Sequence, residues 1–324
     1  MTTRRLLLQL LGVGPALLPR LARAGQPVRI ATLKTGTVAW EIDTIIHHKL
    51  DKKHGIDLSL IPVAGKQGAD VLLAGGEADV IVTDWIWVSR QRNSGADYTF
   101  LPYSKQVGAI LVSAESPLNG IADLKGRTIG IAGGPTDKSW VIFQALARKD
   151  FGFDLAQEAE PVFAAPPLLS EKLQVGEVDA LITFWHFAAK LKARGAREIA
   201  SVADAATSLG LDAGTPLLGY VYSESWSAAN GEPARALAAA SADAKAMLAS
   251  DDAEWDRLRP MMNAANDAEF EALKQGFRAG LPGKEPVNVE AAASLFALLA
   301  SIGGQDLVGE KPELAPGTFA NMKG

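Results

Sequence analysis

Cysteine is absent from the 324-residue sequence. Its absence excludes disulfide bonds, thiolate nucleophiles, zinc–thiolate sites and iron–sulfur clusters. Histidine is also scarce, and three of the four histidines, His47, His48 and His54, fall on one predicted helix. No two of these three have the i, i+4 spacing that places two metal ligands on one helix face. We therefore predict neither a metal site nor a bound cofactor.

Blocks of basic residues are missing as well. The formal net charge is −5, and it becomes more negative if residues 1–24, which hold four arginines and no acidic residue, are removed. An acidic surface of this kind disfavours nucleic acid and anionic lipid as partners. The sequence also lacks a recognisable set of nucleophile, base and orienting residue, so we predict no catalytic residues and a protein that is not an enzyme.

Long apolar runs are limited to the amino-terminal segment. Arg4 and Arg5 precede an apolar stretch over residues 6–18, which is too short to span a bilayer, and Ala22-Arg23-Ala24 follows. A basic start, an apolar run and a small-x-small site are typical of a signal peptide. We therefore predict that residues 1–24 are a signal peptide and that the mature protein is periplasmic. The arginine pair resembles a twin-arginine signal, and the choice between the two export routes stays open.

One stretch of sequence occurs twice, one hundred residues apart. Leu, Gly, Glu, Asp, Thr and Trp stand at positions 73, 76, 77, 79, 83 and 85, and again at 173, 176, 177, 179, 183 and 185. In each copy the glycine ends a helix, because it accepts a positive φ at little cost, and a short apolar strand follows. The Thr and Trp then stand at the carboxyl end of that strand, where α/β sheets bind ligands.

A second pair of tryptophans supports this internal repeat. Trp40 and Trp140 each open the helix after the first strand of their half, and Trp85 and Trp185 follow the repeated strands. One interpretation is a cleft between two lobes, lined by indoles from both sides. The alternative is that the four indoles fill the cores of a repeated fold, as most aromatic residues do.

Alternating strands and helices predict an α/β protein with two lobes. We expect parallel-dominated sheets flanked by helices, crossing strands near Val107–Ser113 and Leu217–Tyr222, and a helical tail from residue 232 onward. The predicted boundaries assign residues 25–112 and 219–324, including the tail, to lobe I. Residues 113–218 form lobe II.

This order of segments resembles the two-crossing (type II) periplasmic binding proteins. The chain is most similar to the branch of ABC-importer binding proteins for nitrate, taurine, alkanesulfonates and thiamine-pyrimidine precursors. The resemblance rests on three motifs: Leu73-x-x-Gly76-Glu77-Ala78-Asp79, the strand at 107–112, and Ser116-Pro117 followed by residues 123–130. It implies capture of a small solute between the lobes and delivery to a cognate ABC permease in the inner membrane, by a monomer.

Two kinds of group could bind the solute. Helix amino termini at residues 35–38 and 136–140 favour an anion, such as a sulfonate, taurine or nitrate. Tryptophans beside Asp84 favour a cation or a flat heteroaromatic ring, and this second interpretation is the one we prefer from the sequence. Two alternatives belong to other classes of protein. One is an enzyme on the same fold, such as a lyase, dehydratase or pyrimidine synthase, and the other is a solute sensor or scaffold.

The predicted site therefore combines helix starts, carboxylates and aromatic rings. Thr37 is also a candidate cap of its helix, and His186, next to Trp185, could donate a hydrogen bond to a ligand oxygen. The ten predicted ligand-binding residues are Thr37, Trp40, Asp84, Trp85, Thr136, Asp137, Ser139, Trp140, Trp185 and His186.

Overall fold

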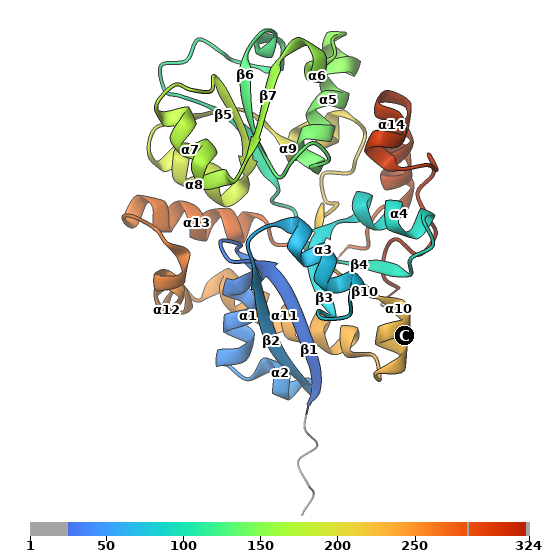
Figure 1. Cartoon of the computed structure of the whole chain (residues 1–324). Coiled ribbons are helices and arrows are strands. Elements are labelled where there is room, and N and C mark those ends of the chain that lie inside the picture. Colours follow the sequence, from blue (N-terminus) through green and yellow to red (C-terminus); the bar gives the residue numbers. More distant parts are fainter. Residues whose placement is uncertain (1–24, 284, 322–324) are drawn as a thin grey trace, which may run out of the picture.

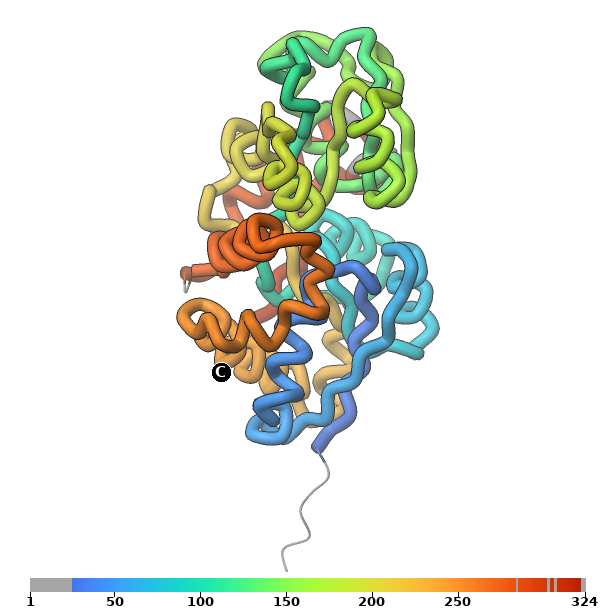
Figure 2. Tube along the Cα trace, turned by 90° about the vertical axis from the view of Figure 1, so that its left-hand side faces the viewer, coloured from blue at the N-terminus to red at the C-terminus, as the bar shows by residue number. Residues whose placement is uncertain are grey.

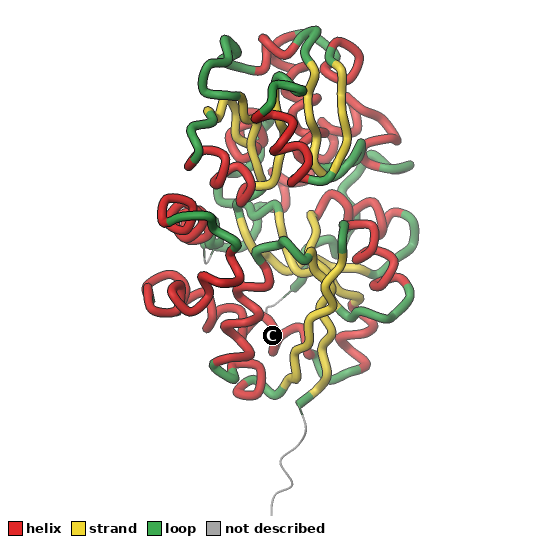
Figure 3. The backbone as a smooth tube through the Cα atoms, turned by 60° about the vertical axis from the view of Figure 1, so that its left-hand side comes forward, coloured by secondary structure: helices red, strands yellow, loops and turns green. Residues whose placement is uncertain are grey.

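A computed structural model of the chain describes residues 25–283 and 285–321 (Figure 1). The predicted signal peptide at residues 1–24 lies outside this part of the chain. The described part contains two five-stranded sheets, each flanked by helices, which confirms the predicted α/β fold class (Figure 3). No helix in these two ranges is long and apolar enough to cross a membrane.

The first lobe is built from parallel strands joined by helices. Its elements up to the first crossing are β1 (Gln26–Leu33), α1 (Val38–His47), α2 (Leu50–Lys53), β2 (Ile56–Val63), α3 (Lys66–Ala74), β3 (Val80–Asp84), α4 (Trp85–Asn93) and β4 (Tyr98–Ser104). β10 (Leu218–Ser223) completes the sheet, in the order β2-β1-β3-β10-β4. β10 pairs antiparallel with both of its neighbours, whereas β1 pairs parallel with β2 and β3.

The second lobe has the same arrangement. Its elements are β5 (Gly108–Val112), the 3₁₀ turn η1 (Ile121–Leu124), β6 (Thr128–Ala132), α5 (Lys138–Phe151), α6 (Leu155–Glu158), β7 (Glu160–Ala164), α7 (Pro166–Gln174), β8 (Ala180–Phe184), α8 (Trp185–Ala193), β9 (Arg197–Ser201) and α9 (Val202–Ser208). The strand order is β7-β6-β8-β5-β9, and β5 is the antiparallel strand.

The two lobes repeat each other element by element. Trp85 and Trp185 are the first residues of α4 and α8, and Trp40 and Trp140 are the third residues of α1 and α5. In each sheet the fourth strand enters directly after the chain has crossed from the other lobe. The repeat seen in the sequence is therefore a repeat of the fold.

The predicted lobe boundary at residue 112 places β5 in the wrong lobe. β5 pairs with β8 and β9 of the second sheet, so the chain crosses at residues 105–107, before this strand begins. The return crossing covers residues 209–217, between α9 and β10. The pattern of a strand alone does not predict which of the two sheets the strand joins, because strands of both sheets need the same apolar residues.

The helical tail contacts both lobes, although the prediction assigned it to the first. It comprises α10 (Glu224–Ala229), α11 (Pro233–Ser250), α12 (Asp252–Met262), α13 (Asp267–Ala279) and α14 (Val289–Val308). α11 and α12 pack on α1 of the first lobe. α13 packs against α8 of the second lobe (Figure 2). In this contact Arg194 Nε lies 2.7 Å from Glu269 Oε1. α14 packs on both α4 and α5.

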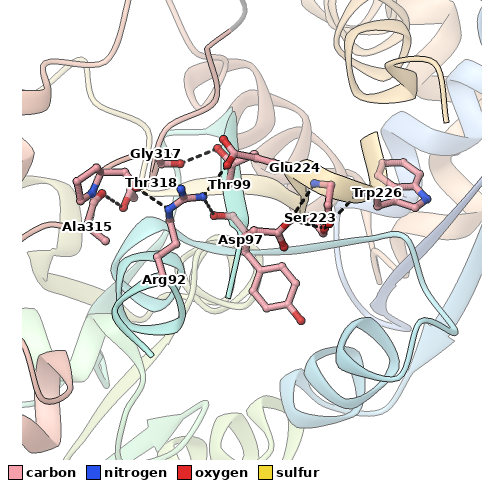
Figure 4. A network of polar contacts seen from close by, with 12 residues as sticks. Arg92, Asp97, Thr99, Ser223, Glu224, Trp226, Ala315, Gly317 and Thr318 are labelled. Atoms are coloured by element: carbon pink, nitrogen blue, oxygen red, sulfur yellow. Dashed lines mark hydrogen bonds and ion pairs between the residues drawn. The ribbon is translucent and has the colours of Figure 1, made fainter. Parts of the chain in front are cut away.

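The end of the described chain is bound to the edge of the first sheet (Figure 4). The Phe100 amide donates to the Thr318 carbonyl at 2.8 Å, and the Ala320 amide donates to the Phe100 carbonyl at 2.9 Å. Arg92 connects the two segments, because Nε donates to the Pro316 carbonyl at 2.6 Å and Nη1 to the Tyr98 carbonyl at 2.8 Å. The carboxy-terminal segment therefore covers the outer edge of β4.

Replacing Arg92 with Met should loosen this segment. The change removes charge-assisted hydrogen bonds to two carbonyls, and we expect the free energy of unfolding to fall by about 1–3 kcal/mol. Amide hydrogen exchange at Phe100 and Ala320 should accelerate more than exchange in the second lobe. Arg235→Met is the control, since Arg235 forms an exposed pair with Glu232. Equal exchange rates in the Arg92 variant and the wild type would contradict this account of the segment.

Candidate functional site

A central cavity of about 110 Å³ lies between the two lobes. Its wall is formed by the carboxyl ends of β1, β3 and β8 and by the loops and helix starts that follow them. The crossing residue Val107 and Leu218 of the return strand close it on one side. This is the position where open α/β sheets bind ligands.

Four helices direct their amino termini at the central cavity. All seven residues at these helix starts are in the cavity wall: Thr37 and Val38 of α1, Lys66 of α3, Asp137 and Lys138 of α5, and Trp185 and His186 of α8. The first backbone N–H groups of a helix have no partner within it and carry a partial positive charge. Four such helix starts around one small cavity favour a negatively charged ligand group.

Two lysines stand at the first positions of these helices. A cation at a helix amino terminus is unfavourable unless an anion offsets it. Lys66 has such an anion, because its Nζ lies 2.8 Å from Asp70 Oδ2. Lys138 is 9% exposed, and the nearest carboxylate oxygen in the described chain, Asp137 Oδ2, is 3.9 Å from its Nζ. Its Nζ also lies 5.9 Å from the centre of the Phe184 ring, so Lys138 is a largely buried side chain whose nearest counter-ion is distant.

His186 joins the two lobes across the cavity. Its pKa is lowered to about 3, mainly by burial and in smaller part by Lys190, and a hydrogen bond to the backbone of Thr35 opposes the shift. The imidazole is therefore neutral at neutral pH. Its Nε2 atom is buried and has no protein partner among the described residues. If the other ring nitrogen carries the proton of the neutral imidazole, Nε2 is an acceptor.

Tyr103 contributes a hydroxyl group from the first lobe. The side chain is buried, and Oη has no partner of regular geometry within the described chain. Burial raises the pKa of Tyr103 well above its usual value, Glu41 raises it further, and the Thr37 side chain offsets only part of the increase. The hydroxyl group therefore remains protonated and can donate to a ligand.

Glu41 itself is not available to a ligand. Its Oε1 accepts from Tyr220 Oη at 2.9 Å and from Ser241 Oγ at 2.6 Å. Its Oε2 lies 2.7 Å from the Nζ of Lys245. A buried carboxylate needs such partners, and here they come from β10 and the tail helix α11. The acidic group beneath the cavity is thus neutralised within the core of the first lobe.

The structure brings four of the ten predicted site residues to the central cavity: Thr37, Asp137, Trp185 and His186. Thr37 occupies the cap position of α1, but its side chain makes no capping hydrogen bond, so the predicted cap is wrong. Asp84 and Thr136 line a separate cavity of about 30 Å³, together with Lys66 and Lys138. Asp84 caps α4 by accepting from the Trp87 amide at 2.8 Å.

The other four predicted residues lie in the cores of the lobes. Trp40, Trp85 and Trp140 are 4%, 0% and 3% exposed. Trp40 packs on Trp255, and Trp85 packs on Phe319, with ring centroids 6.0 and 5.7 Å apart. Ser139 is also buried within α5. The interpretation of a cleft lined by indoles from both lobes is therefore wrong, and the alternative of core packing describes these three tryptophans.

The residues of the cavity wall that were not predicted include the two lysines, Lys66 and Lys138, and Tyr103. The position of the two lysines in the sequence was a usable signal. Each is the first residue of a helix, where the helix dipole disfavours a cation, so a negative charge is expected nearby. Tyr103 gave no signal, because an aromatic residue in a strand is most often part of the core.

Two α/β lobes with this strand order, two crossings and a cavity between them define the periplasmic binding protein fold. The family model described as NMT1/THI5 like matches residues 52–254, and the chain belongs to this family. No curated protein matches the chain in sequence.

Solved structures show the same fold. The alkanesulfonate-binding protein SsuA of Xanthomonas axonopodis pv. citri, bound to MOPS, is 18% identical, with a TM-score of 0.71 over 91% of this chain and 98% of its own. The periplasmic aliphatic sulphonate binding protein SsuA of Escherichia coli is 20% identical, with a TM-score of 0.70 over 91% and 97%. A Candida albicans protein described as having the generic periplasmic binding protein fold is 13% identical, with a TM-score of 0.62 over 93% and 98%.

The depressed pKa of His186 makes stability depend on pH. Unfolding raises the pKa from about 3 toward 6.5, so the unfolded chain binds the additional proton. The stabilising contribution is complete above pH 6.5 and is lost as the pH falls from 6.5 toward 3. Between pH 7 and pH 5 we expect His186 to account for a loss of about 2 kcal/mol.

Denaturant unfolding of the wild type and His186→Phe at both pH values measures this loss. The variant should lose less stability than the wild type over the same interval, because the other three histidines are common to both. Identical pH dependence in the two proteins would show that the His186 imidazole is not held neutral by the fold.

Proposed function

We propose that the protein is the solute-binding component of an ABC importer and that it captures a small organic oxyanion, such as a sulfonate, in the central cavity. The observation that carries the proposal is the largely buried Lys138 side chain, with no close counter-ion in the described chain, at the meeting point of four helix amino termini. A desolvated cation is costly without a counter-ion, and Asp137 is too far away to be a close one. A bound oxyanion would supply the missing charge.

The burial of the tryptophans removes the main support for a cationic or flat ligand. A cage for a cation needs exposed ring faces around the ligand, whereas three of the four indoles are packed in the cores. Trp185 alone among the four lines the central cavity. The volume of about 110 Å³ also favours a ligand of few atoms, since sites for drug-sized ligands measure ~300–1,000 Å³.

The remaining polar groups fit the surroundings of an anionic head group. Tyr103 Oη can donate to an oxyanion, and the helix starts provide backbone donors. The Nε2 atom of His186 is an acceptor, so it would be satisfied by a hydroxyl or amino group of the ligand or by a water molecule. The two SsuA structures, whose printed descriptions name alkanesulfonate and aliphatic sulphonate, support the same class of ligand.

The partner and the location follow from the same proposal. A binding protein of an importer hands its solute to a permease in the inner membrane, and it works as a monomer outside the cytoplasm. The proposed location requires export, so residues 1–24 should be absent from the mature chain, which should begin at or near Gly25. Mass determination of the periplasmic protein measures this directly. An intact Met1 on cytoplasmic protein would contradict it.

Calorimetric titration with ethanesulfonate, propionate and an aminopyrimidine cation tests the ligand class. We expect the anions to bind and the cation to fail. Lys138→Met should weaken anion binding by about 10- to 150-fold, because hydrogen bonds to charged groups contribute about 1.5–3 kcal/mol. Lys149→Met is the matched control: Lys149 lies at the other end of α5 and donates to the Ser208 carbonyl.

Three outcomes would overturn the proposal. The aminopyrimidine could bind in place of the anions, Lys138→Met could leave anion affinity at the wild-type value, or the protein could convert the bound compound. The last result would indicate an enzyme on the same fold, and product detection after incubation with each compound distinguishes it from stoichiometric binding.

A further inference from the structure

A second cavity lies directly behind the central cavity. Its volume is about 400 Å³, and it is bordered by α8, α13 and the β5–β9 side of the second sheet and partly open to solvent. Polar side chains stand around it, among them Lys192 and Glu198, which pair with each other at 2.7 Å. The residues that face it from α8 and α13 are otherwise small: Ala188, Ala189, Ala193, Ala272, Gly276 and Ala279. We name this space the rear chamber.

Trp185 separates the two spaces. Within the described chain it is the only residue that belongs to both walls. Its backbone amide donates to the Val107 carbonyl of the first crossing at 3.0 Å, and its indole meets the edge of Trp40, with ring centroids 6.1 Å apart. The backbone of Trp185 is therefore fixed to the first crossing, and its indole is in contact with Trp40 of the first lobe.

The tail helix is shaped to receive this indole. A Cβ atom at Gly276 would lie 2.7 Å from Trp185 Cζ3 and 3.0 Å from Cε3, so no other residue fits there without moving the ring. Glycine is unfavourable inside a helix, and Gly276 lies inside α13. The repeat offers a comparison, because Trp85 occupies the equivalent position in the first lobe and packs on Phe319 with no glycine opposite it.

We propose that the Trp185 indole sets the greatest length of ligand that the central cavity accepts, by closing it off from the rear chamber. The inference rests on the proposed function, an organic oxyanion bound at Lys138. A ligand with its head group near Lys138 has its tail stopped by the indole. Without the indole the tail continues into the rear chamber along the alanine and glycine surface of α8 and α13, where part of its apolar surface is removed from water.

Straight-chain alkanesulfonates from methanesulfonate to octanesulfonate are the probes, titrated by calorimetry into the full mature protein. Wild-type affinity should fall at least tenfold between ethanesulfonate and hexanesulfonate. In Trp185→Ala the fall should disappear, and affinity should increase by about fourfold for each added methylene group. Trp85→Ala, the variant of the equivalent residue in the first lobe, should keep the wild-type chain-length profile.

Two further variants keep the test independent of the stability of Trp185→Ala. Trp185→Ala/Ala272→Leu refills the rear chamber and should restore the wild-type limit. Gly276→Ala retains the indole but pushes it from the side of the rear chamber toward the central cavity. It should weaken binding of the longest sulfonate that the wild type accepts by at least tenfold and leave methanesulfonate nearly unaffected.

The outcomes separate this inference from the proposed function. The wild type, Trp185→Ala and Gly276→Ala could bind sulfonates with the same chain-length profile. This outcome overturns the role of Trp185 and leaves the proposed function in place. Equal wild-type affinity for ethanesulfonate and hexanesulfonate has the same meaning. Failure of every sulfonate to bind any of the proteins overturns the proposed function, and this inference with it.

Discussion

The arrangement depends on one constraint, which is that parallel strands are joined by helices that return over the sheet. Each such helix begins at the carboxyl end of a strand, so its positive end lies at that edge. The two sheets place these edges on opposite sides of one cavity, and four helix starts meet there. The affinity for negative charge is thus a property of the topology. Side chains such as Lys138 strengthen it and determine where the charge is held.

The fold was largely predictable because the sequence contains an internal repeat, one copy for each lobe. Glycines at 76 and 176, apolar strands and equivalent tryptophans predicted both halves, and the structure has them in equivalent places. What the pattern could not predict was the partner of a segment. β5 pairs with β8 of the second sheet, and α13 packs on the second lobe through Arg194–Glu269 and the contact of Gly276 with Trp185. These are tertiary contacts, and the local periodicity of a segment does not predict them.

The site was predictable only in part, for the same reason. The repeat placed Trp40, Trp85, Trp140 and Trp185 at equivalent positions, but equivalent backbone positions do not have equivalent surroundings. Phe319 covers Trp85 and Trp255 covers Trp40, and both covering residues come from the tail, which has no counterpart in the repeat. The predicted site included Asp137 and omitted its neighbour Lys138, although a lysine at a helix start is the more unusual of the two residues.

The position of α13 constrains any rotation of one lobe against the other. One side of this helix contacts α8 through Arg194–Glu269, and just before the helix the Asn263 carbonyl, which follows α12, accepts from Lys190 Nζ at 2.7 Å. The other side packs Phe277 against Trp40 and Trp255. Rotation at the two crossings alone would pull this helix from one lobe and expose aromatic surface. Opening by shear, in which α8 slides along α13 while the rings stay covered, avoids that cost.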